Sequence, residues 1–481
     1  MLNKYEAVIG LEVHAQLLTN SKLFCGCSAK FGNEPNTNIC PICLGHPGVL
    51  PVLNKKAVEF TALMGLATNC KINQKSIFAR KNYFYPDLPK GFQTSQYDKP
   101  LCEDGFLEVK TKDGLTKKIN IKRIHLEEDA GKSIHDQAYE TLVDVNRCSV
   151  PLMEIVTDPD INSSEEAYLY LTKIKQIVQY LDICDGNMEE GSLRCDANVS
   201  VRLIGEKTLG TKTEVKNMNS FRNVEKAINK EIERQIEIIE DGGKIIQQTL
   251  LWNDNDNNVS PMRSKEEAHD YRYFPEPDLM PVVIDEKWQT RLLSILPELP
   301  EKKIERFVTQ YQLPLYDSEI LTQDKSIAEY FENVTSICDD YKSASNWIMT
   351  SVLGYLNEKK INIKQFPISS ENFGKMLNLI KSGIISSKIA KEIFSEMLEN
   401  NSDPEIIIKE KNLVQISDTD EIKKIIEFIL DTNKSELEDY LNGKEKIFGS
   451  FVGKIMKESK GKANPKIVNE LLKSILESMK N

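Results

Sequence analysis

The chain has 481 residues and a formal net charge of −11 at pH 7, with 40% hydrophobic and 28% charged residues. This length allows two to four domains with buried cores, and the negative balance excludes a protein whose whole surface is basic for nucleic-acid binding. No stretch approaches the roughly 20 apolar residues of a membrane span, and the first residues lack the pattern of a signal peptide. We therefore expect a cytoplasmic protein with no membrane partner.

The first predicted strand carries two candidate metal ligands on one face. Between Ile9 and Leu17, the side chains of Glu12, His14 and Gln16 alternate with apolar residues. Successive side chains of a strand point to opposite faces, so one face is apolar and the other is polar. Such a polar face costs free energy unless it meets water, a ligand or another polar group. We expect Glu12 and His14 to point together into a site.

Two short cysteine pairs follow this strand. They are Cys25-x-Cys27 and Cys40-Pro-Ile-Cys43, separated by 12 residues rich in Gly and Asn. Four thiolates at this spacing suit a tetrahedral zinc in a structural site, because no position stays open for water. The alternative is four ordinary thiols, since Cys-x-Cys is tighter than the usual zinc pair. His46 is the spare ligand if one cysteine does not bind, and we predict a zinc-knuckle insertion near residues 25–43.

A basic and aromatic segment begins at Phe78. Arg80, Lys81 and Asn82 are followed by the ring of Tyr83, in a loop stiffened by prolines. Cations suit phosphate groups, and aromatic rings suit stacking on a base. The composition is compatible with a nucleotide contact and equally with an ordinary surface loop.

The stretch from Ile124 to Lys132 joins a strand to an acidic turn. Glu127, Glu128 and Asp129 follow an apolar/polar alternation and lead directly into Ala-Gly. Carboxylates at a strand end suit a hard cation, although an isolated acidic run is also typical of a solvated surface hairpin. The Gly-Lys-Ser that follows is not a P-loop, because Leu126 occupies the position of the first glycine.

A third predicted strand, from Leu193 to Arg202, again has one polar face. Asp196 and Asn198 lie on it, and apolar residues and a cysteine alternate with them. The polar faces of three such strands could line one concave surface of a sheet. Two helices with core-forming stripes are also expected, one capped at Ser163 and one over residues 220–241.

Beyond Pro297 the apolar residues recur at helical spacing, and the last segment of the chain is basic. From residue 444 to the end there are nine lysines and four glutamates, a balance of +5. Two amphipathic helices are expected there, and the lysines around the turn between them favour a contact with nucleic acid. The alternative is a solvated lysine face. The candidates for this contact are Lys454, Lys457, Lys460, Lys462 and Lys466.

Several long motifs, in order, resemble one known family. They are Gly-Leu-Glu-Val-His-Ala-Gln-Leu at 10–17, Tyr-Pro-Asp-Leu-Pro-Lys-Gly at 85–91, His-Leu-Glu-Glu-Asp-Ala-Gly-Lys at 125–132, Gly-Ser-Leu-Arg-Cys-Asp-Ala-Asn-Val-Ser at 191–200, Lys-Asn-Met-Asn-Ser-Phe at 216–221 and Asp-Tyr-Arg-Tyr-Phe-Pro-Glu-Pro-Asp at 270–278. With the Lys-Ala-Asn-Pro of the tail, they cover essentially the whole chain. Together they resemble the B subunits of glutamyl/aspartyl-tRNA amidotransferases.

The resemblance implies an α+β fold, with a glutamine-synthetase-like N-terminal β-sheet domain at 1–295. The change to a helical pattern places a connecting domain at 296–410 and a basic helical tail at 411–481, and the resemblance makes tRNA the expected ligand of the tail. The family forms a heterotrimer with an amidase and a small third protein, and acts on misacylated tRNA(Gln) or tRNA(Asn). Its B subunit uses ATP and magnesium to phosphorylate the side-chain carboxylate, and ammonia that the amidase releases from glutamine displaces the phosphate. Zinc would be an accessory feature, since some members lack the four cysteines.

Candidate site residues follow from the matching motifs. Those expected to hold magnesium and to act in catalysis are Glu12, His14, Glu127, Glu128 and Asp196. Those expected to contact ATP are Arg80, Lys81, Asn82, Lys132, Arg147, Arg194 and Asn198. Glu127 and Glu128 would point to opposite faces of a regular strand, so the sequence leaves open which of them is a ligand. His14 is an unusual magnesium ligand and could instead orient a carboxylate.

Two other classes of protein fit parts of the sequence. A metal-dependent hydrolase would use the same acidic cluster to activate water, without ATP or a partner. A non-catalytic tRNA-binding module would use the basic tail and show no metal dependence. Consumption of ATP on addition of mischarged tRNA distinguishes the three classes.

Overall fold

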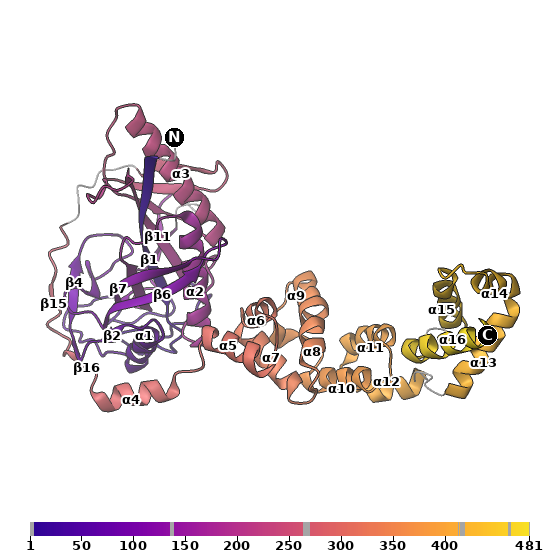
Figure 1. The fold of residues 1–481 in the computed structure, drawn as a ribbon. Helices are drawn as coiled ribbons and strands as arrows, with labels where there is room; N and C mark the ends of the chain where they lie inside the picture. Colours follow the sequence, from indigo (N-terminus) through magenta and orange to yellow (C-terminus); the bar gives the residue numbers. More distant parts are fainter. Residues whose placement is uncertain are drawn as a thin grey trace. The chain divides into compact units, whose positions relative to one another are not determined.

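The structure is a computed structural model that describes residues 4–134, 139–262, 270–411, 413, 419–459 and 463–480. It divides into two compact units, Met1–Pro300 and Glu301–Asn481. The first unit is built on a large sheet with helices and the second is helical (Figure 1). The predicted α+β class is therefore confirmed, while the three-domain division at residues 295 and 410 stays a prediction.

The first unit contains a nine-stranded sheet. Its strands are β1 (Tyr5–Gln16), β2 (Lys71–Ile72), β6 (Cys102–Lys110), β7 (Thr116–Glu128), β10 (Pro151–Thr157), β11 (Leu193–Leu203), β12 (Thr213–Lys216), β13 (Thr249–Asn253) and β14 (Asn258–Pro261). Their order is β14-β13-β12-β11-β1-β10-β7-β6-β2, and all neighbours are antiparallel except β12 and β13. The three polar-faced strands expected from the sequence are β1, β7 and β11, and β10 lies between β1 and β7.

One face of this sheet is apolar and is covered by three helices. They are α1 (Lys55–Ala67), α2 (Ser164–Tyr180) and α3 (Phe221–Glu240). Leu11, Val13 and Ala15 of β1 are fully buried in the core that these helices share with the sheet. The side chain of Ser163 caps α2, as the sequence predicted, and the side chain of Ser220 caps α3. The alternation along β1 therefore leaves its polar residues on the opposite face.

A second, three-stranded sheet with the order β15-β4-β5 packs beside the end of β7. Its strands are β4 (Phe78–Asn82), β5 (Phe92–Gln96) and β15 (Phe274–Pro275). Ser95 of β5 donates a hydrogen bond to Glu127 of β7 at 2.8 Å, so this sheet reaches the polar face. The remaining elements of the unit are β3 (Lys75–Ser76), β8 (Lys132–Ile134), β9 (Leu142–Asp144), β16 (Val282–Val283) and α4 (Glu286–Ile295).

The second unit has two hydrophobic cores, one formed between Phe307 and Ile408 and one between Ile422 and Leu476. Its helices are α5 (Pro300–Gln310), α6 (Leu315–Leu321), α7 (Lys325–Thr335), α8 (Tyr341–Trp347), η2 (Ile348–Val352), α9 (Leu353–Lys359), η3 (Ile363–Gln365), α10 (Ser370–Lys381), α11 (Ser387–Asn400), α12 (Pro404–Lys411), α13 (Thr419–Thr432), α14 (Lys434–Leu441), α15 (Ile447–Glu458) and α16 (Pro465–Lys480). The two amphipathic helices expected in the tail are α15 and α16. Within the described ranges, no helix has both the length and the apolar character needed to cross a membrane.

A buried glutamate, Glu231, links α3 to the sheet. Glu231 of α3 is fully buried and accepts hydrogen bonds from Thr213 Oγ1, Arg234 Nε and Gln235 Nε2, each at 2.7 Å. Glu231→Ala would remove all three hydrogen bonds and the carboxylate that pairs with Arg234, so we expect the free energy of unfolding to fall by roughly 3 kcal/mol. Glu233→Ala is the matched control, because Glu233 is exposed on the same helix and should change stability by less than about 0.5 kcal/mol. Urea unfolding followed by circular dichroism measures both, and equal midpoints would contradict the assigned role of Glu231.

Candidate active site and cysteine cluster

The register of the sheet brings the polar faces of four strands side by side. Glu12 on β1 lies opposite Asp196 on β11. Two residues further along β1, His14 lies opposite Glu154 on β10, which in turn lies opposite His125 on β7. Residues directly opposite one another on neighbouring strands share a face. These side chains therefore meet on the face that the three helices do not cover.

Three side chains of this face form a candidate metal site. The ligand atoms of His14, Glu127 and Glu154 all lie within 4.8 Å of one another. Carboxylate oxygens are the donors that hard divalent cations prefer, and an imidazole widens the range to softer metals. Our sequence-based prediction missed Glu154, although it is the one charged residue in the strand Pro151–Thr157. That lone charge was the available signal.

His125 is buried beside this cluster, and its Nε2 lies within ion-pairing distance of both carboxylates. Its Nε2 lies 2.7 Å from Glu154 Oε2 and 3.4 Å from Glu127 Oε2. Burial alone would lower the pKa of His125, but the two carboxylates raise it to about 9. Burial alone would raise the pKa of Glu154, but His125 lowers it below the usual value of a glutamate. The imidazolium therefore balances part of the negative charge of both acids.

Lys81 of β4 brings a second cation to the cluster. Its ammonium lies 4.6 Å from the ring centre of Tyr271 and 5.7 Å from that of Tyr83. Burial opposes the charge on Lys81, whereas Glu127 raises its pKa above the ordinary lysine value. Of the residues expected to contact ATP, Lys81 is therefore one that lies next to the carboxylate cluster.

Glu12 and Asp196 occupy the adjacent part of the same face. Asn198 Nδ2 donates to Glu12 Oε1 at 2.9 Å, and Lys216 Nζ donates to Asp196 Oδ2 at 3.1 Å. Burial and the neighbouring Glu154 raise the pKa of Glu12. Lys216 was not among the site residues predicted from the sequence, although it is the first residue of the Lys-Asn-Met-Asn-Ser-Phe motif.

A cavity of about 320 Å³ opens next to Glu12. Its lining includes Gly10, Glu12, Lys122, Arg123, Asn198 and Lys212. Arg123 Nε is buried and, within the described part of the chain, has no hydrogen-bond partner. Three basic side chains around one concave space suit an anionic ligand, and the volume lies at the lower end of the range for small-molecule sites.

Glu128 lies outside the three-residue cluster. Its carboxylate accepts hydrogen bonds from Lys90 Nζ, from Thr94 N at 2.7 Å and from Ser149 Oγ at 2.9 Å. Glu127 is therefore the one of the two adjacent glutamates that joins His14 and Glu154. The side chains of Lys90, Thr94 and Ser149 also line a second cavity, of about 200 Å³.

Arg80 and Asn82, both expected to contact ATP, connect β4 to the segment around β15. Arg80 forms ion pairs with Glu276 at 2.7 Å and with Asp278 at 3.0 Å. Asn82 Nδ2 donates to the carbonyl oxygen of Arg272 at 2.8 Å. The structure thus gives both side chains protein partners away from the three-residue cluster.

Arg147 and Arg194, also expected to contact ATP, surround Asp129. Arg194 Nη2 donates to Asp129 Oδ2 at 2.9 Å, and Arg147 Nε donates to the carbonyl oxygen of Ala130 at 2.9 Å. Burial would raise the pKa of Asp129, but the two guanidinium groups lower it. Lys132 is exposed on β8. These contacts hold the turn that follows Glu128.

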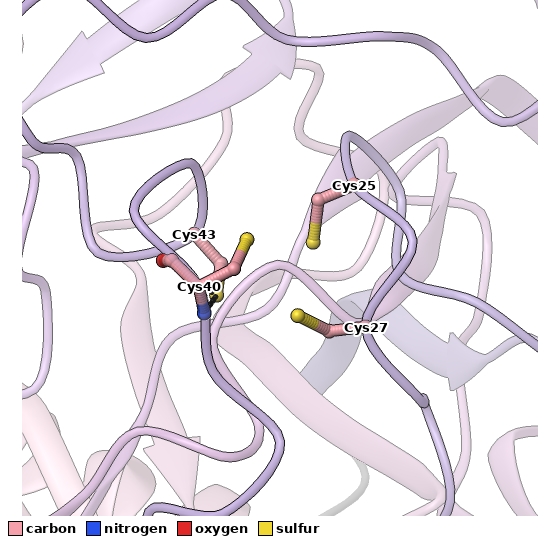
Figure 2. Close-up of side chains that lie close together, drawn as sticks. All are labelled: Cys25, Cys27, Cys40 and Cys43. Atoms are coloured by element: carbon pink, nitrogen blue, oxygen red, sulfur yellow. Dashed lines mark hydrogen bonds between the residues drawn. The ribbon is translucent and has the colours of Figure 1, made fainter.

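The four predicted zinc ligands come together in the structure. Figure 2 shows the sulfur atoms of Cys25 and Cys27 facing those of Cys40 and Cys43, and all four lie within 4.8 Å of one another. A tetrahedron with Zn–S bonds of about 2.3 Å places sulfur atoms roughly 3.8 Å apart, so this set fits zinc. Cys25 donates to Cys43 and lowers the pKa of the Cys43 thiol to about 5. All four cysteines are free, and His46 is not part of the group.

The structure describes three of the five tail lysines. Lys460 and Lys462 lie outside the described residues. Lys454 forms an ion pair of 2.6 Å with a glutamate of α14. Lys457 on α15 and Lys466 on α16 are exposed.

Two family models match the chain, "GatB/GatE catalytic domain" over residues 7–290 and "GatB domain" over residues 329–476. The B subunit of the aspartyl/glutamyl-tRNA(Asn/Gln) amidotransferase of Thermodesulfovibrio yellowstonii is 58% identical over 473 residues, which are 98% of this chain and 99% of that protein. The B subunits of the same name from Chlorobium phaeobacteroides and Geobacter sulfurreducens are both 55% identical. They cover 98% and 97% of this chain, and 99% and 98% of their own lengths. The chain therefore belongs to the GatB family, the B subunits of the tRNA-dependent amidotransferases that act in Gln-tRNA and Asn-tRNA formation.

Proposed function

We propose that this chain uses ATP to activate the side-chain carboxylate of glutamate on tRNA(Gln), of aspartate on tRNA(Asn), or of both. Ammonia derived from glutamine then converts the activated group to the amide. The relatives' printed names supply the substrate class. The observation that carries the proposal is the cluster of His14, Glu127 and Glu154, with Lys81 beside it.

Activation is needed because a carboxylate is a poor electrophile for ammonia. An oxygen of the substrate carboxylate attacks the γ-phosphorus of ATP, and the bond to the bridging oxygen breaks to release ADP. Ammonia then attacks the acyl carbon and loses a proton while phosphate leaves. The transfer of the phosphoryl group depends mainly on positioning and on neutralising negative charge.

The described side chains suit this requirement. His14, Glu127 and Glu154 are the proposed magnesium ligands, and the ion when bound would neutralise charge on the phosphate oxygens. The imidazole of His125 lies within ion-pairing distance of both carboxylates through its Nε2 and, when protonated, offsets part of their charge. Lys81 provides a fixed positive charge beside Glu127 that a transferring phosphoryl group could meet.

The cavity next to Glu12 is the proposed nucleotide pocket. Lys122, Arg123 and Lys212 supply positive charge for phosphates. Asn198, which was expected to contact ATP, lines this cavity and bonds to Glu12. Because Glu12 and His14 share one face of β1, a nucleotide in the cavity would lie close to the proposed metal site.

We further propose that ammonia comes from a partner. The sequence has no Gly-x-Ser-x-Gly nucleophile elbow, and four of its cysteines are gathered in the sulfur cluster. The proposed assembly is a heterotrimer with an amidase, which hydrolyses glutamine, and a small third protein. The basic tail would contact tRNA phosphates, which give affinity without reading sequence.

The cysteine cluster is proposed to hold one structural zinc. A loop with few buried apolar residues gains folding free energy when a metal joins its two ends. Four sulfur ligands leave no open coordination position, so the ion would take no part in the reaction.

The carboxylate cluster can be tested in the assembled complex with mischarged tRNA, by measuring ADP formation and glutamine hydrolysis separately. We expect Glu127→Gln and Glu154→Gln each to lower ADP formation by roughly 100-fold, because a neutral amide weakens both metal binding and charge neutralisation. Asp196→Asn should also block carboxylate activation. Glutamine hydrolysis should be largely unchanged, since it occurs in the amidase. Glu108→Gln is the control, an exposed carboxylate on β6. Near-normal amidation by the cluster variants would refute the assignment.

The zinc site can be tested by metal analysis of protein purified without a chelator. We expect one zinc per chain, and its loss in Cys40→Ser, because three thiolates complete the tetrahedron poorly. Cys338→Ser is the matched control, since Cys338 is buried in the core of the second unit. A wild-type protein without zinc would disprove the site.

The proposed contact between the tail and tRNA can be tested at the lysines that are exposed in the structure. Lys457 and Lys466 are exposed, whereas Lys454 is already paired with a glutamate. We expect the double variant Lys457→Gln/Lys466→Gln to weaken tRNA binding, and to lower the slope of log affinity against log salt by up to roughly one unit for each lost contact. The control Lys454→Gln should have a smaller effect. Unchanged affinity and slope in the double variant would leave these lysines as a solvated face.

A further inference from the structure

Lys22 is fully buried and lies against the cysteine cluster. Its Nζ is 3.6 Å from Cys43 Sγ and donates a hydrogen bond to that sulfur. In the described part of the chain, no carboxylate lies within ion-pairing distance of this ammonium. A buried ammonium has a large desolvation cost unless an anion faces it. The group that faces Lys22 is a cysteine sulfur.

The backbone fixes Lys22 between the two cysteine pairs. Ser21 and Ser28 form a β-bridge, and Lys22 N donates to the carbonyl oxygen of Cys27 at 3.0 Å. The lysine thus stands at the base of the turn that carries the first pair, while its side chain reaches Cys43 of the second pair. Asn54 Nδ2 donates to the carbonyl oxygen of Lys22 at 3.3 Å and holds the same turn from the start of α1.

Zinc bound by the four cysteines would leave a net negative charge, which a nearby cation would offset. Zinc with four thiolates carries a net charge of −2, and a buried anion is stable when it is paired and hydrogen-bonded. Cys43 Sγ also accepts a hydrogen bond from the backbone nitrogen of Cys40 at 3.2 Å. Lys22 would halve the excess negative charge.

We propose that Lys22 is the charge-compensating residue of a zinc tetrathiolate formed by Cys25, Cys27, Cys40 and Cys43. It is a positioning residue, which acts on the metal through the Cys43 sulfur. The inference rests on the proposed zinc site and adds a residue outside both cysteine pairs. Neither cysteine spacing nor zinc motifs identify it.

The test compares the full-length wild type with Lys22→Met, which keeps the apolar stem and removes the charge, and with Lys22→Arg, which keeps the charge. Lys30→Met is the matched control, because Lys30 is an exposed lysine of the same loop. Zinc affinity is measured by competition with a chromogenic chelator, and the ligand field by the absorption spectrum of the cobalt(II)-loaded protein. We expect Lys22→Met to lower zinc affinity by roughly 10- to 100-fold and to shift the sulfur-to-cobalt charge-transfer bands. Lys22→Arg should lose less affinity, and Lys30→Met should match the wild type.

The outcomes separate this inference from the zinc site itself. Wild-type zinc affinity in folded Lys22→Met protein overturns the role of Lys22, as do equal losses in the Met and Arg variants. If Lys22→Met does not fold, a crystal structure of the zinc-loaded wild type decides. An ammonium within hydrogen-bonding distance of the Cys43 sulfur supports the inference, and a displaced one overturns it. A wild type that binds no zinc overturns the metal site and the inference together.

Discussion

The arrangement of the first unit depends on the free energy that it would cost to bury the polar side chains of β1 in the apolar core. Leu11 and Val13 of β1 are fully buried against the helices, while Glu12 and His14 occupy the other face. A slip of one residue would place both polar side chains in the apolar core, so the register of β1 is strongly fixed. That register sets His14 opposite Glu154. The constraint that folds the sheet therefore also builds the candidate metal site.

The polar face of the sheet also concentrates negative charge. Several carboxylates share this surface, and repulsion between them contributes to the raised pKa of Glu12. Three cations of the chain balance part of this charge: His125 between two acids, Lys81 beside Glu127, and Lys216 beside an aspartate. Each lies beside carboxylates of this face, and His125 is buried. A divalent cation would add positive charge where the fold already concentrates acids, which is the reason for proposing a metal site there.

Local signals predicted much of the fold, because alternation and capping act within a few residues. Residues 220–241 were expected to form a helix, and the structure has α3 capped by Ser220. Glu154 could not be paired with His14 from the sequence, since their contact depends on β10 lying between β1 and β7, which is a long-range arrangement. The choice between Glu127 and Glu128 was open for a similar reason. It depends on Lys90 and Ser149, which are distant in the chain and hold Glu128 elsewhere.

The cysteine loop and the acidic strand end are connected by direct contacts. Gly45 has a φ of +67°, and a Cβ atom there would lie 2.5 Å from Cγ of Lys90, so the loop packs tightly on that lysine. Lys90 in turn forms an ion pair with Glu128, whose chain neighbour Glu127 belongs to the candidate metal site. Closely packed groups transmit strain because they have little room to adjust. The loop that the cysteines organise therefore helps to fix Lys90, and Lys90 keeps Glu128 apart from the cluster that Glu127 joins.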